Sequence, residues 1–176
     1  MRLPPLPEDQ WDERTRSSLA ALLPPGRRNP QGAGTALATL ARHPDLTKTF
    51  LPFNAHLLRR STLPPRLREL AILRVARRCA CAYEWTHHVK IAAREGLSET
   101  EIEAAGRGEA VDQLDNAVLN AVDELDDNCN LSDQTWAALG KHLDERQLMD
   151  LVFTVGAYRM VAMAFNTLGV EPEQER

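Results

Sequence analysis

The sequence predicts an all-α protein. Ala, Leu, Arg and Glu dominate the chain, and these residues favour helices. Runs that alternate β-branched and polar residues, which are typical of half-buried strands, are missing. At 176 residues, with 43% apolar and 26% charged residues, the chain is long enough to bury a sizeable core. We therefore expect one helical domain over residues 1–176, with an N-terminal lead-in over 1–34.

The first helix is expected over residues 8–23, the stretch EDQWDERTRSSLAALL, because Pro24, Pro25 and Gly26 follow it directly. The next segment, 24–34, has the Pro- and Gly-rich composition of a loop. This start of the chain is therefore expected to contain one helix and one long connection.

Two helices are expected next, over residues 35–43 and 45–60. A His-Pro dipeptide ends the first, because the residue before a proline avoids the helical region. Asp45 is the expected N-cap of the second helix. Pro52 is expected to kink or break that helix, since a proline removes one backbone hydrogen bond.

The central region contains two further predicted helices. Residues 61–78 carry their prolines at the start, where a helix tolerates them, and Leu70 and Leu73 belong to an apolar stripe at helical spacing. Residues 81–97 form the second helix, which Gly96 closes at the C′ position.

The remainder of the chain also has helical patterns. Ser98 and Glu101 have the spacing of a capping box, which marks a helix start. Apolar stripes at helical spacing continue up to the C-terminal region. The expected helices cover residues 98–108, 111–128, 132–143 and about 145–168.

Charge and cysteine content exclude several classes of protein. The net charge is −4 and the pI is near 5.7, so the chain lacks the basic surface that nucleic-acid binding needs. Three cysteines are an odd number, and a chain of this length needs no disulfide staples, which indicates thiols in a reducing compartment. The N-terminus lacks the apolar segment of a secretion signal, so we expect a cytoplasmic protein.

One stretch, residues 148–170, is apolar enough to suggest a membrane span. Asp150 and Arg159 interrupt it, and each would be costly in hydrocarbon. We therefore predict a helix buried inside the protein or an oligomer, and no membrane partner.

The candidate site is the stretch CAYEWTHH, residues 81–88. Cys81, Glu84 and His88 stand at i, i+3 and i+7, so they project from one face of a helix. Cys81 is expected in the first turn, where unpaired N–H groups and the helix dipole favour a thiolate. Glu84 lies one turn before His88, so its carboxylate can fix the imidazole tautomer or raise the imidazole pKa.

A second carboxylate comes from the preceding helix. Glu69 faces inward if Leu70 and Leu73 mark the core side, and an antiparallel neighbour would bring it beside residues 81–88. A thiol, two carboxylates and an imidazole would then converge, and such groups cluster at functional sites.

A purely structural interpretation of the same residues stays open. A Glu–His pair at i, i+4 is a common helix stabiliser, and a free cysteine is often only a small buried hydrophobe. On this interpretation Tyr83 and Trp85 pack, and Cys79 and Cys129 are structural. The motif lacks a recognised zinc spacing, so no metal site is expected.

The stretch LPPRLRELAILRVARRCACAYEWTHHVKIAAREGLSETEIEA, residues 63–104, closely resembles the carboxymuconolactone decarboxylase and alkylhydroperoxidase D-like superfamily. The resemblance implies an all-α fold, assembly into trimers or hexamers, and a small-molecule substrate. The peroxidase branch of that superfamily works through a Glu, a Cys-x-x-Cys pair and a His four residues further on. Glu69, Cys81 and His88 match the Glu, the first Cys and the His.

Glu84 stands where that branch has its second cysteine, in a Tyr-Glu-Trp pattern similar to the decarboxylase-like branch. A peroxidatic thiol oxidises to sulfenic acid and needs a resolving thiol to form a disulfide. A disulfide between Cys81 and Cys79 would be strained. This departure argues against alkylhydroperoxidase turnover, while one-Cys chemistry with an external thiol stays open.

Three functions are therefore considered. The first is a cofactor-free, decarboxylase-like enzyme for a small organic acid or lactone, in which the resemblance makes His88 the proton donor. Arg74 or Arg66 would hold a substrate carboxylate. The second is a thiol peroxidase that uses Cys81, and the third is a non-catalytic, oligomeric ligand-binding protein. The candidate catalytic residues are Glu69, Cys81, Glu84 and His88, and the candidate substrate-binding residues are Arg74, Tyr83 and Trp85.

Overall fold

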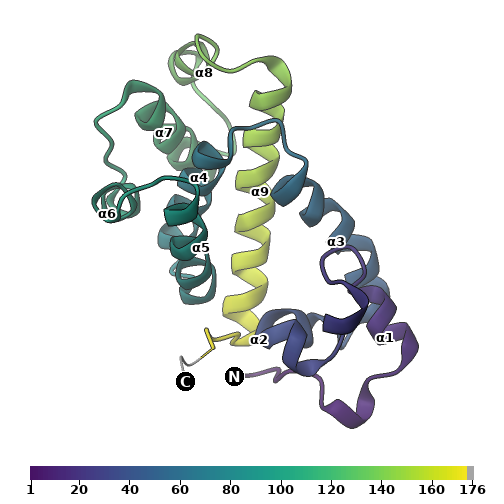
Figure 1. Ribbon diagram of the computed structural model, residues 1–176. Coiled ribbons are helices and arrows are strands. Elements are labelled where there is room, and N and C mark those ends of the chain that lie inside the picture. Colours follow the sequence, from purple (N-terminus) through teal and green to yellow (C-terminus); the bar gives the residue numbers. More distant parts are fainter. Residues whose placement is uncertain (174–176) are drawn as a thin grey trace. The chain divides into compact units, whose positions relative to one another are not determined.

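The structure is a computed structural model that describes residues 1–173 (Figure 1). Its secondary structure is helical, and no strand occurs within the described residues, which confirms the all-α prediction. Two short 3-10 helices are η1 (Glu8–Gln10) and η2 (Pro25–Arg27). The α-helices are α1 (Glu13–Ser18), α2 (Pro30–Leu40), α3 (Pro44–Arg59), α4 (Pro65–Arg78), α5 (Ala82–Arg94), α6 (Glu99–Arg107), α7 (Gln113–Asn128), α8 (Asp133–Leu139) and α9 (Glu145–Leu168).

The helices divide into two compact units. The first unit contains residues 1–60 and the chain from Ala164 onward, and the second contains Ser61–Met163. α9 therefore contributes to both units. The whole of the candidate site belongs to the second unit.

The first unit has its own apolar core. Helix α1 packs against α3. The Trp11 indole N–H donates to the Leu6 carbonyl at 3.0 Å, and the Leu3 amide donates to the Leu168 carbonyl at 2.9 Å. The buried core residues are Leu6, Trp11, Leu19, Leu23, Ala33, Ala38, Ala41 and Leu51.

The helix predicted over residues 8–23 is shorter in the structure. α1 begins at Glu13 because the Asp12 carboxylate accepts a hydrogen bond from the Thr15 N–H at 2.7 Å and caps the helix. It ends at Ser18, and turns follow. A side-chain cap inside a stretch of good helix formers therefore sets this boundary.

The loop predicted over residues 24–34 contains the start of α2, so this prediction is wrong. Asn29 caps α2 by accepting from the Gly32 N–H at 2.8 Å, and Pro30 occupies the start of the helix, where its missing N–H costs nothing. Gly34 has φ +67°, a left-handed conformation that breaks the helix after its first turn. The Pro- and Gly-rich segment 24–34 therefore contains a capped helix start and a kink.

His43 caps α3, not the predicted Asp45. The His43 Nδ1 accepts from the Leu46 N–H at 3.2 Å, whereas Asp45 lies in the first turn and pairs with Arg14. Pro52 lies inside α3 and does not end it.

In the second unit α4 packs against α5, α6 and α7, and α7 packs against α8 (Figure 1). Leu70 and Leu73 are buried, so the apolar stripe predicted for α4 faces the core. The Ser98–Glu101 capping box is present at the start of α6. Gly96 follows the C-cap of α5 with φ +92°, as predicted.

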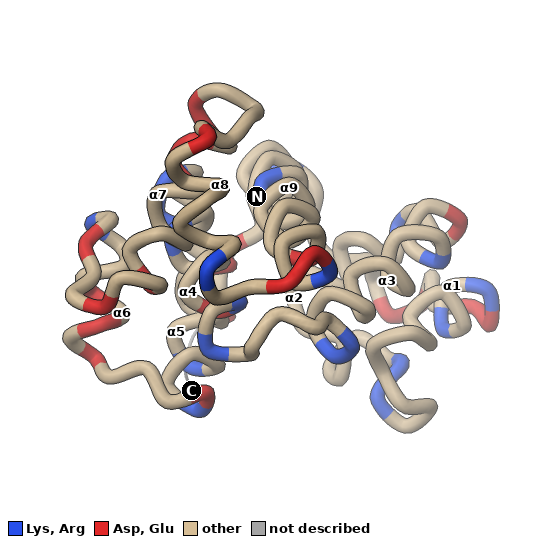
Figure 2. Tube along the Cα trace, turned by 90° about the horizontal axis from the view of Figure 1, so that it is seen from above, with Lys and Arg blue, Asp and Glu red and all other residues tan. Residues whose placement is uncertain are grey.

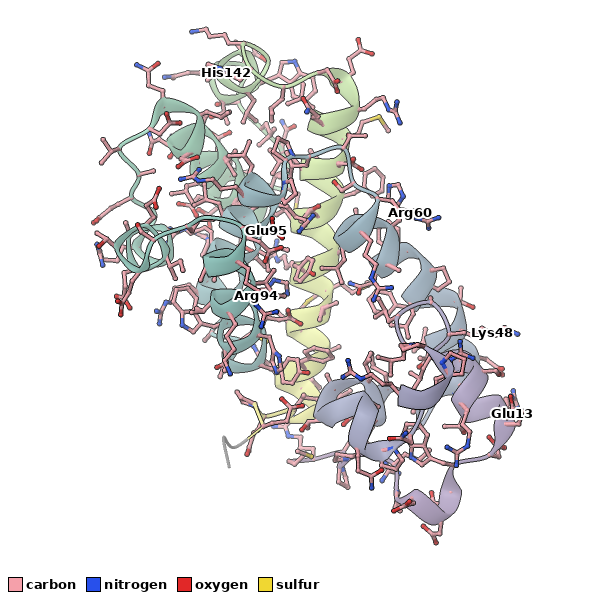
Figure 3. The ribbon with its side chains drawn as sticks, viewed as in Figure 1. Glu13, Lys48, Arg60, Arg94, Glu95 and His142 are labelled. Atoms are coloured by element: carbon pink, nitrogen blue, oxygen red, sulfur yellow. The ribbon has the colours of Figure 1, made fainter. Side chains whose placement is uncertain are left out.

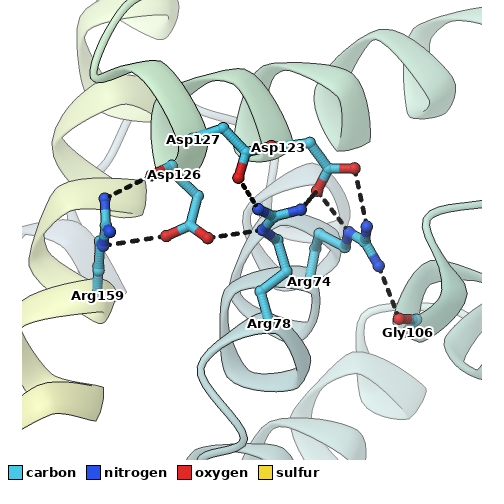
Figure 4. A network of polar contacts seen from close by, with 7 residues as sticks. All are labelled: Arg74, Arg78, Gly106, Asp123, Asp126, Asp127 and Arg159. Carbon is cyan, nitrogen blue, oxygen red and sulfur yellow. Dashed lines mark hydrogen bonds and ion pairs between the residues drawn. The ribbon is translucent and has the colours of Figure 1, made fainter.

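Ion pairs connect α4 to α7, and α7 to α9. Arg74 binds Asp123 through two hydrogen bonds of 2.7 and 2.8 Å and donates to the Gly106 carbonyl of α6 at 2.8 Å. Figure 2 shows Lys and Arg, and Asp and Glu, on helices of both units. The network consists of Arg74, Arg78, Asp123, Asp126, Asp127 and Arg159 (Figure 4).

Within residues 1–173, α9 is the one helix long and apolar enough to cross a membrane. Half of its most apolar window is buried. The two charges that interrupt it both have protein partners. Asp150 accepts from the Thr62 N–H at 2.6 Å, and Arg159 pairs with Asp126 at 3.0 Å.

Candidate functional site

Helices α4 and α5 hold a buried imidazole between two carboxylates. His88 Nδ1 lies 2.6 Å from a carboxylate oxygen of Glu69, and His88 Nε2 lies 3.1 Å from a carboxylate oxygen of Glu84. Glu69 is fully buried, and Glu84 and His88 are 6% and 5% exposed. The convergence of these three side chains, predicted from their spacing, is confirmed.

A tight connection produces this arrangement. Only residues 79–81 separate α4 from α5, so α5 folds back along α4. Ala80 has φ +50° in this link, an uncommon conformation for a residue other than glycine. Glu84 and His88 then stand on successive turns of α5, and the His88 ring contacts both Glu84 and Glu69 on α4.

Arg68 adds a fourth charge to the buried cluster. Its Nε donates to Glu69 at 3.0 Å, and its side chain is buried. When His88 is protonated, two carboxylates face two cations and the cluster is neutral. With a neutral imidazole the cluster would contain one uncompensated negative charge, which is costly in a protein interior. Charge balance therefore favours the imidazolium.

The pKa of His88 reflects the same competition. Burial lowers the pKa of His88, but the hydrogen bonds to Glu69 and Glu84, together with their negative charges, outweigh burial and raise it to about 9. The imidazole is therefore protonated at neutral pH and donates to both carboxylates.

Tyr158 from α9 completes the surroundings of His88, and the sequence analysis missed it. The Tyr158 ring meets the His88 ring edge-on, with centroids 5.0 Å apart, and Tyr158 is buried. Burial and the charges of Glu84 and Glu69 raise the pKa of Tyr158 well above its usual range, so the phenol stays neutral. A tyrosine inside an apolar helix was the available signal, because a buried phenol needs polar surroundings.

Cys81 differs from its prediction. It is the N-cap residue of α5 instead of a first-turn residue, and it is 1% exposed. Burial raises the pKa of the Cys81 thiol, and the Glu84 charge adds to this rise, although the N–H groups of Glu84 and Tyr83 oppose it. The expected preference for a thiolate is therefore wrong, since burial outweighs the effect of the helix start.

A surface pocket of about 290 Å³ lies where α4 ends and α5 begins. It is lined by Arg77, Cys81, Trp85, Thr86 and three alanines. The Arg77 guanidinium lies 3.9 Å from the centroid of the Trp85 ring. The pocket thus brings Trp85, a candidate substrate-binding residue, beside Cys81.

Tyr83 and Arg74 do not line this pocket. The Tyr83 ring packs against the His87 ring, with centroids 4.2 Å apart. The Arg74 guanidinium is occupied by Asp123, so the structure gives no support to Arg74 as the residue that holds a substrate carboxylate. The alternative, Arg66, is also paired with two carboxylates.

Cys79, Cys81 and Cys129 form no disulfide in the described part of the chain. Cys79 is partly buried, and burial raises the pKa of its thiol. Cys129 is exposed and ends α7 in a left-handed conformation with φ +54°. Within residues 1–173 no group of three or more His, Cys, Asp and Glu side chains is arranged to hold a metal ion.

The comparisons with known proteins agree with this architecture. Residues 44–127 match the Carboxymuconolactone decarboxylase family. No curated protein matches the chain. An alkylhydroperoxidase AhpD core structure, an uncharacterised peroxidase-related protein from Ralstonia eutropha, is 16% identical with a TM-score of 0.75, over 99% of this chain and 94% of that chain. A protein of unknown function from Agrobacterium tumefaciens is 21% identical with a TM-score of 0.68, over 76% and 94%.

A third similar structure is the debrominase Bmp8 in its apo form, 16% identical with a TM-score of 0.71, over 97% of this chain and 91% of that chain. The all-α fold is similar to the folds of these AhpD-like structures. Residues 44–127, which include α4 and α5, thus match the Carboxymuconolactone decarboxylase family, and the fold of the chain is similar to that of the AhpD core structure.

Proposed function

We propose that the protein is a cofactor-free acid–base enzyme that decarboxylates a small organic acid or lactone. One observation carries the proposal: His88 is held as an imidazolium between Glu69 and Glu84, at 2.6 and 3.1 Å. A decarboxylase must deliver one proton to a carbon atom of the enolate that forms when CO₂ leaves, and a positioned acid performs that task. The match of residues 44–127 to the Carboxymuconolactone decarboxylase family supports the same reaction type.

In the proposed step the bond between the substrate and its carboxylate breaks and CO₂ departs. The electron pair moves into a conjugated lactone carbonyl and forms an enolate. Both nitrogens of His88 face carboxylates, so the proton passes from His88 Nε2 to Glu84 and from Glu84 to carbon. Glu69 and Arg68 keep the imidazole oriented, and water returns the proton.

Glu84 directly precedes Trp85, which lines the pocket between α4 and α5. Cys81, three residues before Glu84, lines the same pocket. Three residues correspond to a rise of about 4.5 Å along a helix. The proposed transfer therefore requires a substrate that extends from this pocket by about one helical turn, so that its reacting carbon comes within reach of Glu84.

Deuterium incorporation tests the proposal. With β,γ-unsaturated lactone acids in D₂O, we expect one deuterium in the product for each CO₂ released. His88→Gln and Glu84→Gln should each lower kcat by about 10²- to 10⁴-fold. Glu95→Gln, at the exposed end of α5 (Figure 3), is the matched control and should leave kcat unchanged. Decarboxylation that survives His88→Gln would overturn the proposal.

A thiol peroxidase is the second candidate, favoured by the place of Cys81 on the pocket wall. The raised pKa of the Cys81 thiol and the presence of Glu84 instead of a second cysteine count against it. After mild hydroperoxide treatment, intact mass should therefore show no loss of two protons, because no disulfide forms at Cys81. A disulfide from Cys81 to Cys79 or Cys129 that reforms in every turnover would favour the peroxidase.

A further inference from the structure

We propose that the pocket between α4 and α5 binds the carboxylate of a small, mainly apolar organic acid through Arg77. The inference rests on the proposed function for the identification of that acid as the substrate. It assigns the carboxylate-binding role to a residue that the sequence analysis did not consider.

Arg77 differs from the other arginines of α4. The helix carries five arginines, and four of them pair with carboxylates: Arg66, Arg68, Arg74 and Arg78. Arg77 is exposed. Within residues 1–173 it forms no ion pair with a carboxylate, and its contact is with the Trp85 ring. Its charge is therefore available to a ligand.

The contact between Arg77 and Trp85 does not use the guanidinium N–H groups, which donate no hydrogen bond within residues 1–173. The guanidinium lies over the Trp85 ring at 3.9 Å, and a cation–π contact of this kind engages the flat face of the guanidinium. The N–H groups at its edge can then bind a carboxylate through two parallel hydrogen bonds. Stacking on Trp85 also restricts the Arg77 side chain, so less conformational entropy is lost on binding.

The lack of a side chain at Gly106 of α6 leaves room for the Arg77 and Trp85 side chains. A Cβ atom at this position would lie 2.9 Å from the Trp85 ring and 3.2 Å from Arg77 Nε. The backbone of α6 therefore abuts both side chains and supports them beside the pocket.

The remaining lining residues define the ligand. Thr86 and Cys81 are polar and uncharged side chains, and three alanines and Trp85 make the wall mainly apolar. Arg77 is the only charged residue among the lining residues of this pocket in the described part of the chain. A volume of about 290 Å³ suits a small ligand. A monocarboxylate with a short apolar or planar body fits these features, whereas a dianion would lack a second cation.

Binding of benzoate to the full-length protein tests the inference without relying on catalysis. In a two-dimensional ¹H–¹⁵N NMR titration, benzoate should shift the Trp85 indole N–H and Arg77 Nε–H signals. Benzamide has the same shape without the charge and should bind about tenfold more weakly or worse. Arg77→Gln should weaken benzoate binding by about tenfold or more, and Arg77→Lys should fall between, because it keeps the charge but loses the planar donor pair.

Arg94→Gln is the matched control, since Arg94 is an exposed arginine at the end of α5 (Figure 3) and its loss changes the net charge by the same amount. It should leave benzoate affinity unchanged. Benzoate that leaves the Trp85 and Arg77 signals in place, or that binds Arg77→Gln as well as wild type, would overturn the inference. If Arg77→Gln decarboxylates the substrate with an unchanged KM, the role of Arg77 is refuted and the proposed function stands. Arg77-dependent benzoate binding without any decarboxylation would refute only the proposed function.

Discussion

At the residue scale, the protonation of His88 depends on carboxylates from two helices. Replacing Glu69 or Glu84 with Gln removes a negative charge but keeps the side-chain shape. Each change should lower the His88 pKa from about 9 by about one unit, or about 1.4 kcal/mol. NMR titration of the imidazole measures this shift, with Glu95→Gln as the control that should have no effect. If neither change moves the His88 pKa, the carboxylates do not set its protonation.

The same residue makes folding stability depend on pH. The pKa of His88 is raised from 6.5 to about 9 in the folded protein, so the folded state binds the proton more tightly than the unfolded chain. The stabilisation is complete below about pH 6.5 and is lost as pH rises towards about 9, with a magnitude on the order of 3 kcal/mol. Urea unfolding at several pH values should show this decline in wild type and a flatter profile in His88→Gln. Equal slopes in both proteins would contradict it.

At the element scale, Gly106 controls how closely α6 approaches α5. A methyl group there would come within 2.9 Å of the Trp85 ring, so Gly106→Ala should destabilise the fold by about 1–3 kcal/mol and change the Trp85 indole signal. Gly26→Ala is the control, because no atom lies within 4 Å of a Cβ built at that position. Urea unfolding of both variants measures the difference. Equal stability of the two variants would show that α6 shifts freely.

Elements were predictable where local signals decide the structure. Gly96 and the Ser98 capping box are local, and they place the ends of α5 and α6. Residues 8–34 were predicted less well. Asp12 caps a helix inside a segment predicted to be helical from residue 8, and Asn29 caps a helix inside a segment predicted to be a loop.

In the candidate site, too, the residues placed by local sequence were predicted and those placed by helix packing were not. Glu84 and His88 are neighbours along one helix, and the short link to α4 brings Glu69 to them. Tyr158 and Arg77 escaped prediction because their positions depend on how α9 and α6 pack. Spacing within one helix does not contain that information.

At the scale of the whole molecule, one face of α9 presents apolar side chains to solvent. Within the second unit these residues lie 3, 4, 11 and 14 positions after the first of them, close to whole turns of the helix, so they share a face. An exposed apolar patch on a helix marks an interaction site. The residues are Met149, Val152, Phe153, Met160 and Met163, which are 36–61% exposed.

We expect this face to be buried in a homo-oligomer, a trimer or larger, because association would remove its apolar surface from water. Light scattering should give a mass that is at least three times 19.7 kDa. Glutamate at both Phe153 and Met160 should dissociate the assembly, since it would place charges in an apolar interface. Val111→Glu, at a fully exposed position outside this face, should leave the mass unchanged. A stable wild-type monomer at micromolar concentration would refute the assembly and leave the exposed face of α9 unexplained.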